Sequence, residues 1–383
     1  MLERPSAGLD AQAAVLVCLD FGDVSHADAV EELVRLAHSA GAVRHALVEG
    51  RRLRPDPRFF AGSGKVAEIG RAAREINAAF VIFNHVLSGA QQRNLEQELG
   101  RRVLDRTELI LQIFAQRART SEGKVQVELA QLEHLSTRLV RGWTHLERQR
   151  GGLGKTGGPG ETQLELDKRY IARRVRVLKD KLDQMQRQRS VQRRARARGA
   201  VYSISLVGYT NSGKSSLFNA LTHAGALEAD RLFATLDTTT RRIYLPEAGT
   251  VALSDTVGFI RELPHTLVES FRATLEETVH ADLLLHVVDS ASPARERQIE
   301  DVNAVLREIA ADSIPQIEVW NKIDLRDGGA APAAGAVRDE YGRISRVFVS
   351  ARTGAGLAEL RMAIAEAALR RATAAPAAVA ISI

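Results

Sequence analysis

The segment from Gly208 to Ser215 constrains the fold of this chain more than any other part of the sequence. It has the spacing GxxxxGK[ST] and directly follows the apolar run Tyr202–Val207. A glycine-rich turn between a strand and a helix surrounds the phosphates of a nucleotide with backbone N–H groups. We expect Lys214 to contact the β- and γ-phosphates and Ser215 to bind Mg²⁺. A helix predicted over Ser216–Leu221 would direct its positive end at the same phosphates. The pattern predicts a doubly wound P-loop domain.

A second motif, about a hundred residues later, indicates which base is bound. The apolar run Ile317–Trp320 leads into Asn321-Lys322-Ile323-Asp324, an NKxD sequence. The two carboxylate oxygens of Asp324 match the paired N1–H and N2–H donors of guanine, which adenine lacks. We expect Lys322 to lie along the base and Asn321 to connect this motif to the phosphate loop. Further on, Ser350-Ala351-Arg352 follows a predicted strand, where guanine sites present a backbone N–H to the base oxygen.

The residues between these motifs are expected to sense Mg²⁺ and the γ-phosphate. A strand predicted over Val251–Ser254 ends at Asp255-Thr256-Val257-Gly258. Asp255 would hold Mg²⁺ through water, and the backbone N–H of Gly258 would contact the γ-phosphate. Thr235 is the candidate for a second hydroxyl on Mg²⁺, closing over the site when the γ-phosphate is present. The neighbouring residues Thr238, Thr239 and Thr240 are the alternatives, because they share the same polar segment.

Phe259 follows the γ-phosphate sensor, at a position where many signalling GTPases carry a glutamine that orients the attacking water. A phenylalanine side chain has no hydrogen-bonding group and cannot orient water. We therefore expect slow hydrolysis in the free protein, stimulated by a macromolecular partner.

Composition limits the remaining possibilities. The chain has 383 residues, enough for two or three domains, and a net charge of +6 that is compatible with a polyanionic partner. Its single cysteine, Cys18, cannot form a disulfide within the chain and is expected to pack as a small hydrophobic residue. The amino terminus does not resemble a signal peptide, and no apolar run is long enough to predict a membrane span.

The first hundred or so residues alternate apolar runs with amphipathic segments and predict a smaller α/β unit. Strands are expected over Ala13–Leu19, Val43–Val48, Phe80–Phe83 and Val103–Leu104, with helices over His26–Ser39 and Ala90–Leu99. Phe60-Ala-Gly-Ser-Gly-Lys65 is a glycine turn leading into a helix. It could bind an anion, but it lacks the spacing of a phosphate loop.

The middle of the chain predicts a long antiparallel helical hairpin. Apolar residues recur at spacings of three, four and seven in two stretches, namely Val125, Leu129, Leu132, Leu139, Trp143 and Leu146, and then Leu164, Ile171, Val175, Leu178, Leu182 and Met185. Residues 151–160, with six glycines and one proline, cannot continue either helix and form the predicted tip.

Basic residues are concentrated at both ends of this hairpin. Near the tip they are Arg138, Arg141, Arg148, Arg150 and Lys155, and Arg187–Arg198 carries six arginines without a carboxylate. A single basic run is usually a solvated helix face. Two runs around a projecting hairpin favour contact with RNA, in which arginines bind phosphates and glycines permit a close approach.

Three stretches resemble the HflX family of translation-factor-related, ribosome-associated GTPases. They are Gly158–Glu165, which reads GPGETQLE, together with Val103–Leu111 and Glu122–Leu132. The resemblance extends over about residues 10 to 370. It implies a cytoplasmic GTPase that binds the large (50S) ribosomal subunit and its rRNA, and that in some members separates stalled or stressed ribosomes. It also implies that Ser215 and Thr235 bind Mg²⁺ and that Phe233–Asp237 contact the nucleotide.

This sequence departs from the family pattern in two places. Thr238 stands where members commonly have proline, and Lys168 replaces a usual arginine after the signature. The region after the GTPase domain is also short, whereas some members carry a further C-terminal domain, so ribosome splitting is expected less firmly than binding of the large subunit. The alternatives are a ribosome-assembly or RNA-binding GTPase that splits nothing, and a signalling GTPase with a protein partner.

The predicted architecture is an N-terminal α/β domain (1–115), a helical hairpin (116–199), a GTPase domain (200–372) and a tail (373–383), and we expect a monomer. The predicted catalytic residues are Lys214, Thr235 and Gly258, and the predicted Mg²⁺ ligands are Ser215 and Thr235. The predicted GTP contacts are Gly208, Tyr209, Thr210, Asn211, Ser212, Gly213, Lys214, Ser215, Phe233, Ala234, Thr235, Leu236, Asp237, Asp255, Thr256, Val257, Gly258, Asn321, Lys322, Ile323, Asp324, Ser350, Ala351 and Arg352.

Overall fold

The computed structural model describes residues 12–22, 26–142, 163–198, 201–222, 232–261, 272–326 and 333–374. The predicted glycine-rich tip (151–160) and residues 375–383 of the predicted tail lie outside these ranges. The described residues divide into two compact units, one up to Gln186 and one from Arg187 onward. Among the helices that are described, none has a stretch long and apolar enough to cross a bilayer.

The first unit contains a parallel four-stranded sheet in the order β2-β1-β3-β4. Its strands are β1 (Ala13–Asp20), β2 (Arg44–Arg51), β3 (Phe80–Phe83) and β4 (Arg102–Leu104). Strands β1 and β3 are almost completely buried, as expected for parallel strands covered on both faces. The predicted α/β unit is confirmed, with each strand boundary within three residues of its predicted position.

Helices cover both faces of this sheet. One face carries α2 (Ser63–Glu75) and α3 (Gly89–Leu99), and the other carries α1 (His26–Ser39) and α4 (Arg106–Arg117). Helix α3 begins with a capping box between Ser88 and Gln91 and ends at Gly100 in a left-handed conformation. Helix α4, which has no counterpart among the predicted elements, begins at Asp105, whose carboxylate accepts a hydrogen bond from the backbone N–H of Glu108.

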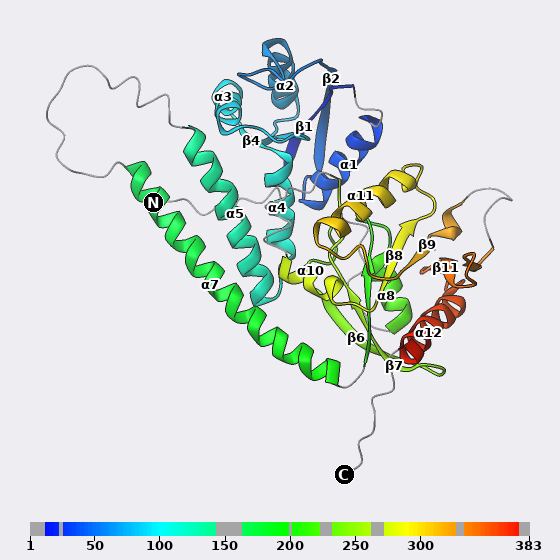
Figure 1. The fold of residues 1–383 in the computed structure, drawn as a ribbon. Helices are drawn as coiled ribbons and strands as arrows, with labels where there is room; N and C mark the ends of the chain where they lie inside the picture. Colours follow the sequence, from blue (N-terminus) through cyan, green and yellow to red (C-terminus); the bar gives the residue numbers. More distant parts are fainter. Residues whose placement is uncertain are drawn as a thin grey trace, which may run out of the picture. The chain divides into compact units, whose positions relative to one another are not determined.

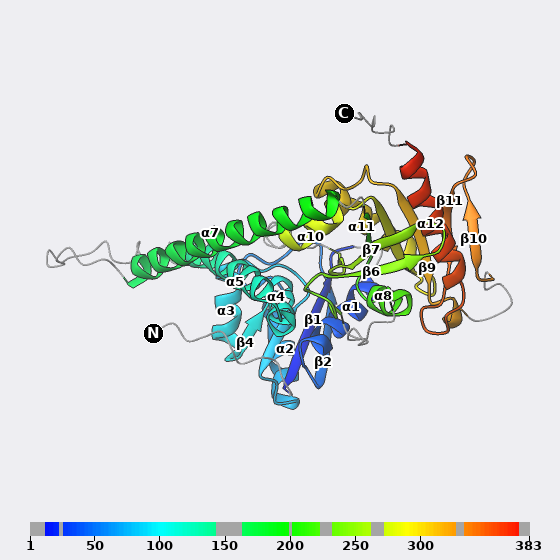
Figure 2. The ribbon, with the colours of Figure 1, turned by 90° about the horizontal axis from the view of Figure 1, so that it is seen from below.

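Two long helices, α5 (Ser121–Gly142) and α7 (Gln163–Arg198), follow this α/β part. They lie side by side and run antiparallel (Figure 1, Figure 2). Their contact is an apolar seam of Val125, Leu129, Leu178 and Leu182, flanked by Leu132 and Val175. The ion pairs Glu128–Arg174 and Glu133–Lys179 border this seam. The predicted helical pair and these six apolar positions are confirmed; Leu139 and Leu164 have no described side chain, and Trp143 and Leu146 lie outside the described residues.

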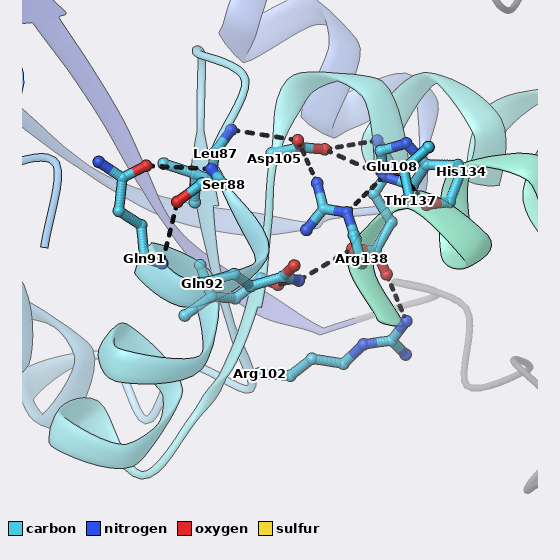
Figure 3. Close-up of polar contacts among 11 residues, drawn as sticks. Leu87, Ser88, Gln91, Gln92, Arg102, Asp105, Glu108, His134, Thr137 and Arg138 are labelled. Carbon is cyan, nitrogen blue, oxygen red and sulfur yellow. Dashed lines mark hydrogen bonds and ion pairs between the residues drawn. The ribbon is translucent and has the colours of Figure 1, made fainter. Parts of the chain in front are cut away.

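The predicted role of Arg138 is wrong. Its guanidinium does not join an RNA-facing cluster near the tip but points into the first unit, where it donates to the carboxylate of Asp105 (Figure 3). Asp105 is fully buried and the Arg138 side chain is 13% exposed. The Arg138 backbone also lies so close to Gly89 that an added Cβ there would sit 3.1 Å from the Arg138 carbonyl oxygen. The buried carboxylate lies 33 residues away in sequence, so a count of local charges around Arg138 could not reveal it.

The second unit is built on a seven-stranded sheet in the order β10-β11-β9-β8-β5-β7-β6. Its strands are β5 (Tyr202–Val207), β6 (Thr239–Leu245), β7 (Gly249–Asp255), β8 (Leu283–Asp289), β9 (Gln316–Asn321), β10 (Gly335–Arg338) and β11 (Ile344–Phe348). The five central strands are parallel, whereas β6 and β10 pair antiparallel at the two edges. Figure 2 shows β10 beside β11 at one of these edges. The doubly wound domain is confirmed, and both antiparallel edge strands are additions to it.

Helices α8 (Lys214–Thr222) and α12 (Leu357–Ala374) cover one face of this sheet, where Phe218 and Ile364 are fully buried. Helices α10 (Arg272–Val279) and α11 (Arg295–Glu308) pack against β5 and β8 on the other face. A short 3₁₀ turn, η1 (Ile323–Leu325), follows β9. The parallel strands place the predicted site residues together, because their carboxyl ends meet at one edge of the sheet.

Candidate nucleotide-binding site

The predicted phosphate loop connects β5 to α8, as its spacing indicates. Gly208 has φ 152°, and an added Cβ there would lie 2.3 Å from the carbonyl oxygen of Val287 on β8. Gly213 has φ 92°, and its added Cβ would lie 2.2 Å from the side-chain nitrogen of Asn321. Both positions therefore require glycine, because a side chain would collide with neighbouring strand ends. At these two positions the backbone of the loop lies directly against β8 and against the Asn321 side chain.

Lys214, the first residue of α8, is buried beneath this loop. Its ammonium group donates to the carbonyl oxygens of Gly208 at 3.1 Å and Tyr209 at 2.9 Å. Burial lowers the Lys214 pKa to about 8, the neighbouring Asp255 charge opposes this shift, and Lys322 adds to it. The ammonium therefore lies beside the loop. Nucleotide phosphates bound there would stabilise its positive charge.

Three oxygen-bearing side chains from separate segments meet next to Lys214. The Ser215 and Thr235 hydroxyl oxygens are 2.7 Å apart, and each lies 2.8 Å from Oδ2 of Asp255. Burial raises the Asp255 pKa, an effect that hydrogen bonds from the Ser215 hydroxyl and the Lys214 charge oppose. The second carboxylate oxygen, Oδ1, is buried and has no hydrogen-bond partner among the described residues. A hard oxygen donor set with a spare buried carboxylate oxygen fits Mg²⁺.

This geometry favours Thr235 over Thr239 and Thr240. Thr239 and Thr240 belong to β6, where they pair with Asp255 and Ser254 in the antiparallel ladder. The Thr240 hydroxyl lies 2.8 Å from the Ser254 hydroxyl, within the sheet. The Thr235 hydroxyl reaches both Ser215 and Asp255, whereas the Thr240 hydroxyl bonds within the sheet.

The segment after Asp255 closes directly onto the phosphate loop. The Phe259 N–H donates to the Gly208 carbonyl at 3.1 Å, and the Thr210 N–H donates to the Phe259 carbonyl at 2.6 Å. Gly258 lies so close to Lys214 that an added Cβ would be 2.9 Å from Nζ. The Phe259 side chain is 1% exposed. Phe259 therefore holds the two loops together through its backbone.

Asn321 connects the base-reading motif to both neighbouring loops. Its side-chain nitrogen donates to the Ser212 carbonyl at 3.0 Å, and its side-chain oxygen accepts from the Ala351 N–H at 3.0 Å. The predicted tie between Asn321 and the phosphate loop is present in this geometry. A backbone N–H of the Ser350-Ala351-Arg352 segment is predicted to meet the base oxygen, and that of Ala351 is engaged by Asn321 in this structure. The two motifs are thus joined although 109 residues separate Ser212 from Asn321.

Asp324 and Lys322 are each oriented by another side chain. The Ser350 hydroxyl donates to Oδ1 of Asp324 at 2.6 Å. The Lys322 ammonium pairs with Asp289, the last residue of β8, at 2.7 Å. Asp289 was not among the predicted site residues. Its position at the end of the apolar run of β8, level with the other site residues, is the signal that could have revealed it.

A cleft lined by the phosphate loop, α8 and the Thr235 segment forms the centre of the described site. Its lining includes nine predicted residues and one that was not predicted, Ser216: they are Thr210, Asn211, Gly213, Lys214, Ser215, Ser216, Phe233, Ala234, Thr235 and Gly258. Three other predicted contacts do not line this cleft. The Thr256 hydroxyl donates to the Leu206 carbonyl in the sheet, and the side chains of Val257 and Leu236 are buried. Such residues could offer a nucleotide only their backbone.

Three known sequence profiles match the chain in succession. Residues 27–115 match "GTP-binding GTPase N-terminal", residues 117–196 match "GTP-binding GTPase Middle Region", and residues 203–322 match "50S ribosome-binding GTPase". The GTPase HflX of Escherichia coli K12 is 50% identical over 366 residues, which are 96% of this chain and 84% of that protein. The chain belongs to the HflX family of GTPases. The HflX protein of Magnetococcus marinus is 49% identical over 89% of this chain and 79% of its own length.

A solved structure shows the same fold at lower identity. The crystal structure of the SsGBP–GDP complex is 24% identical and matches with a TM-score of 0.51, covering 94% of this chain and 99% of that chain. At this identity the likeness concerns the fold alone. As a member of the HflX family, the present chain is a GTP-binding protein and a GTPase.

Proposed function

We propose that this HflX-family GTPase uses GTP and Mg²⁺ to control its binding to the large ribosomal subunit. The supporting observation is the convergence of Ser215, Thr235 and Asp255 within 2.8 Å of one another beside Lys214. In this proposal the two hydroxyls bind Mg²⁺ directly and Asp255 holds it through water. Bound Mg²⁺ would neutralise the charge that develops on the phosphates. Asp324 reads guanine, and Gly258 contacts the γ-phosphate.

Hydrolysis should be slow until a partner acts, because nothing at position 259 can orient water. The Phe259 ring is buried, and its backbone is bonded to Gly208 and Thr210. A partner that repositions this segment, or that supplies its own polar group, would accelerate the reaction. We propose that the ribosome is this partner, and that hydrolysis releases the protein.

The ribosomal role draws support from two features of the chain. The profile that matches residues 203–322 is described as a 50S ribosome-binding GTPase. The antiparallel helices α5 and α7 lead to the glycine-rich segment 151–160, the proposed contact with rRNA. On this basis we propose a cytoplasmic monomer that binds the large subunit and splits stalled or stressed ribosomes.

Sedimentation of intact ribosomes through sucrose gradients, with GTP, GDP or a non-hydrolysable GTP analogue, tests the proposal. Loss of intact ribosomes with the analogue is the expected result. Comigration with large subunits without splitting would indicate a ribosome-assembly factor instead. Absence of comigration with any nucleotide would leave a signalling GTPase with a protein partner.

Deletion of residues 151–160 separates the tip from the nucleotide site. The shortened protein should bind GTP as the full chain does, because its GTPase unit is unchanged, and should fail to bind or split ribosomes. Unchanged ribosome binding and splitting would contradict the role of the tip.

A further inference from the structure

The segment Arg51–Arg58 begins at the last residue of β2, precedes α2, and carries four arginines and one carboxylate. Neither the nucleotide site nor the proposed tip contact uses it. We propose that this segment, the arginine loop, is a second RNA-binding surface, which contacts phosphates through Arg54 and Arg58. The inference rests on the proposed ribosomal function, and adds to it a contact from the N-terminal sheet.

The arginine loop has a fixed backbone. The Asp56 carboxylate accepts from the N–H groups of Arg58 and Phe59, both at 2.8 Å, and the Asp56 and Phe60 backbones pair as an antiparallel bridge. Two amide side chains of α3 hold the loop from outside it. Gln91 donates to the Asp56 carbonyl at 2.8 Å, and Asn94 donates to the Arg58 carbonyl at 3.0 Å. A loop held by this many hydrogen bonds loses little conformational entropy on binding.

One arginine of the loop is structural. Arg52 donates to the carbonyl oxygens of Arg54 and Ala61, and its guanidinium fills the space that a Cβ on Gly62 would need. Arg52 thus connects the loop to the residues that follow it. Its guanidinium also lies at the glycine turn of Phe60–Lys65, whose sequence indicates a possible anion site.

The other arginines remain available to a partner. Arg54 and Arg58 are exposed, and neither has a carboxylate within ion-pair distance among the residues that the structure describes. Arg58 lies over the Phe59 ring with its guanidinium carbon 4.7 Å from the ring centre, which leaves its edge nitrogens accessible. Arg51 is 80% exposed and reaches Asp20 only at 3.7 Å. The one carboxylate inside the loop, that of Asp56, is committed to backbone N–H groups.

Leu53 lies between Arg52 and Arg54 in sequence and is 96% exposed, the highest value among the large hydrophobic side chains described. Burial of a leucine side chain contributes about 1.5–3 kcal/mol to the free energy of folding, and Leu53 contributes none of it. DNA-binding proteins place apolar side chains such as leucine against bases while arginines bind nearby phosphates, and an exposed leucine beside arginines could contact RNA in a comparable way. This combination favours RNA over an acidic protein segment, which offers carboxylates but no flat apolar face between them.

The single buried cysteine makes a direct test possible. Cys18 is 1% exposed, and burial raises its thiol pKa to about 11, so it should resist alkylation. In L53C, the introduced thiol can therefore be labelled selectively with an iron chelate that generates hydroxyl radicals. Val43 is 71% exposed and precedes the opposite end of β2, so V43C is the matched control at roughly 25 Å.

Full-length labelled protein is bound to purified large subunits with a non-hydrolysable GTP analogue, and cleavage of rRNA is mapped by primer extension. We expect localised rRNA cleavage from position 53 and none at those sites from position 43. Binding without rRNA cleavage from position 53, cleavage of ribosomal protein alone, or identical cleavage from both positions would overturn the inference. If even the unsubstituted protein failed to bind large subunits, the proposed ribosomal function itself would fail.

A salt series supplies the second measurement. R54Q and R58Q should each lower the affinity for large subunits about tenfold, and should reduce the slope of log K against log salt concentration by about 1. R71Q, which removes an exposed arginine of α2 in the same unit, is the control and should change neither value. An unchanged slope in both loop variants would contradict phosphate contact by the arginine loop.

Discussion

Arg138 of α5 donates to the buried carboxylate of Asp105, the residue that caps the amino terminus of α4. Asp105 also accepts from the backbone N–H groups of Leu87 at 3.3 Å and Glu108 at 2.8 Å, so one carboxylate joins three segments of the first unit (Figure 3). The helix that leads toward the predicted tip is therefore anchored by a charge pair inside the unit.

Asp105→Asn should destabilise this anchor while preserving the helix cap, because asparagine is also a good N-cap residue. The Arg138 guanidinium would lose its charged partner while remaining mostly buried. We expect a loss of about 1.5–3 kcal/mol in the free energy of unfolding of the first unit, measured by urea denaturation.

Arg102→Gln is the matched control for this substitution. It breaks the Arg102–Glu108 ion pair in the same neighbourhood, whose side chains are 37% and 22% exposed. A solvent-accessible pair contributes about 0–1 kcal/mol. Equal losses in the two variants would show that the Asp105–Arg138 pair has no special role.

His134 should make the stability of the first unit depend on pH. Its Nε2 accepts from Nε of Arg138 at 2.8 Å, and burial, followed by the Arg138 charge, lowers its pKa from 6.5 to about 4, against a raising effect of Glu108. Between these values the unfolded chain binds a proton that the folded protein does not. Stability is therefore complete above pH 6.5 and declines as the pH falls to 4, by about 3 kcal/mol at most.

Hydrogen exchange of α5 amides across this pH range, compared with His134→Gln, measures the effect. The substitution should flatten the dependence in the first unit. His286 in the second unit, whose pKa burial also lowers to about 4, provides an internal reference that the substitution should leave unchanged. An NMR titration placing the His134 pKa near 6.5 would refute this prediction.

Asp324→Asn should weaken GTP binding and shift preference toward xanthine nucleotides, whose base presents an acceptor where guanine presents a donor. Ser350→Ala should have a smaller effect, about fivefold, because it removes only the hydrogen bond that orients Asp324. Competition binding with GTP and XTP measures both. Continued preference of the Asp324 variant for GTP would show that another group reads the base.

Thr235→Ala should reduce GTP hydrolysis at least tenfold and raise the Mg²⁺ concentration needed, while leaving GDP binding nearly unchanged. Thr240→Ala is the control, because its hydroxyl bonds to Ser254 within the sheet and does not reach Asp255. Steady-state hydrolysis over a Mg²⁺ series distinguishes them. A larger defect in the Thr240 variant would indicate that a threonine of β6, and not Thr235, makes the proposed metal contact.

The fold and most of the site were predictable where the pattern is local. The phosphate loop is contiguous, and parallel strands with apolar runs bring Asp255 and Asn321 to the same sheet edge. The helix over His26–Ser39 and the strand over Phe80–Phe83 have the predicted boundaries, because periodicity and burial agree in both. The seam of α5 and α7 likewise follows from its apolar spacing.

The features that the sequence did not reveal depend on partners far away along the chain. The pairing of Lys322 with Asp289 spans 33 residues, and no local rule connects the two. The edge strands β6 and β10 lack continuous apolar runs, because β10 is exposed or half-buried throughout and β6 buries only Ile243 and Leu245. Arg138 was misjudged for the same reason, because its carboxylate partner lies on another helix.

The paired backbones of Phe259 and the phosphate loop have a consequence for how the site responds to its surroundings. The Thr210 N–H can donate either to the Phe259 carbonyl, as it does here at 2.6 Å, or to another acceptor, but not fully to both. If a nucleotide competes for this N–H, nucleotide binding and the release of Phe259 are thermodynamically coupled. Release of Phe259 then raises the nucleotide affinity by the same factor by which bound nucleotide favours that release. Any partner that draws Phe259 outward would then tighten the hold on the nucleotide, without touching the nucleotide itself.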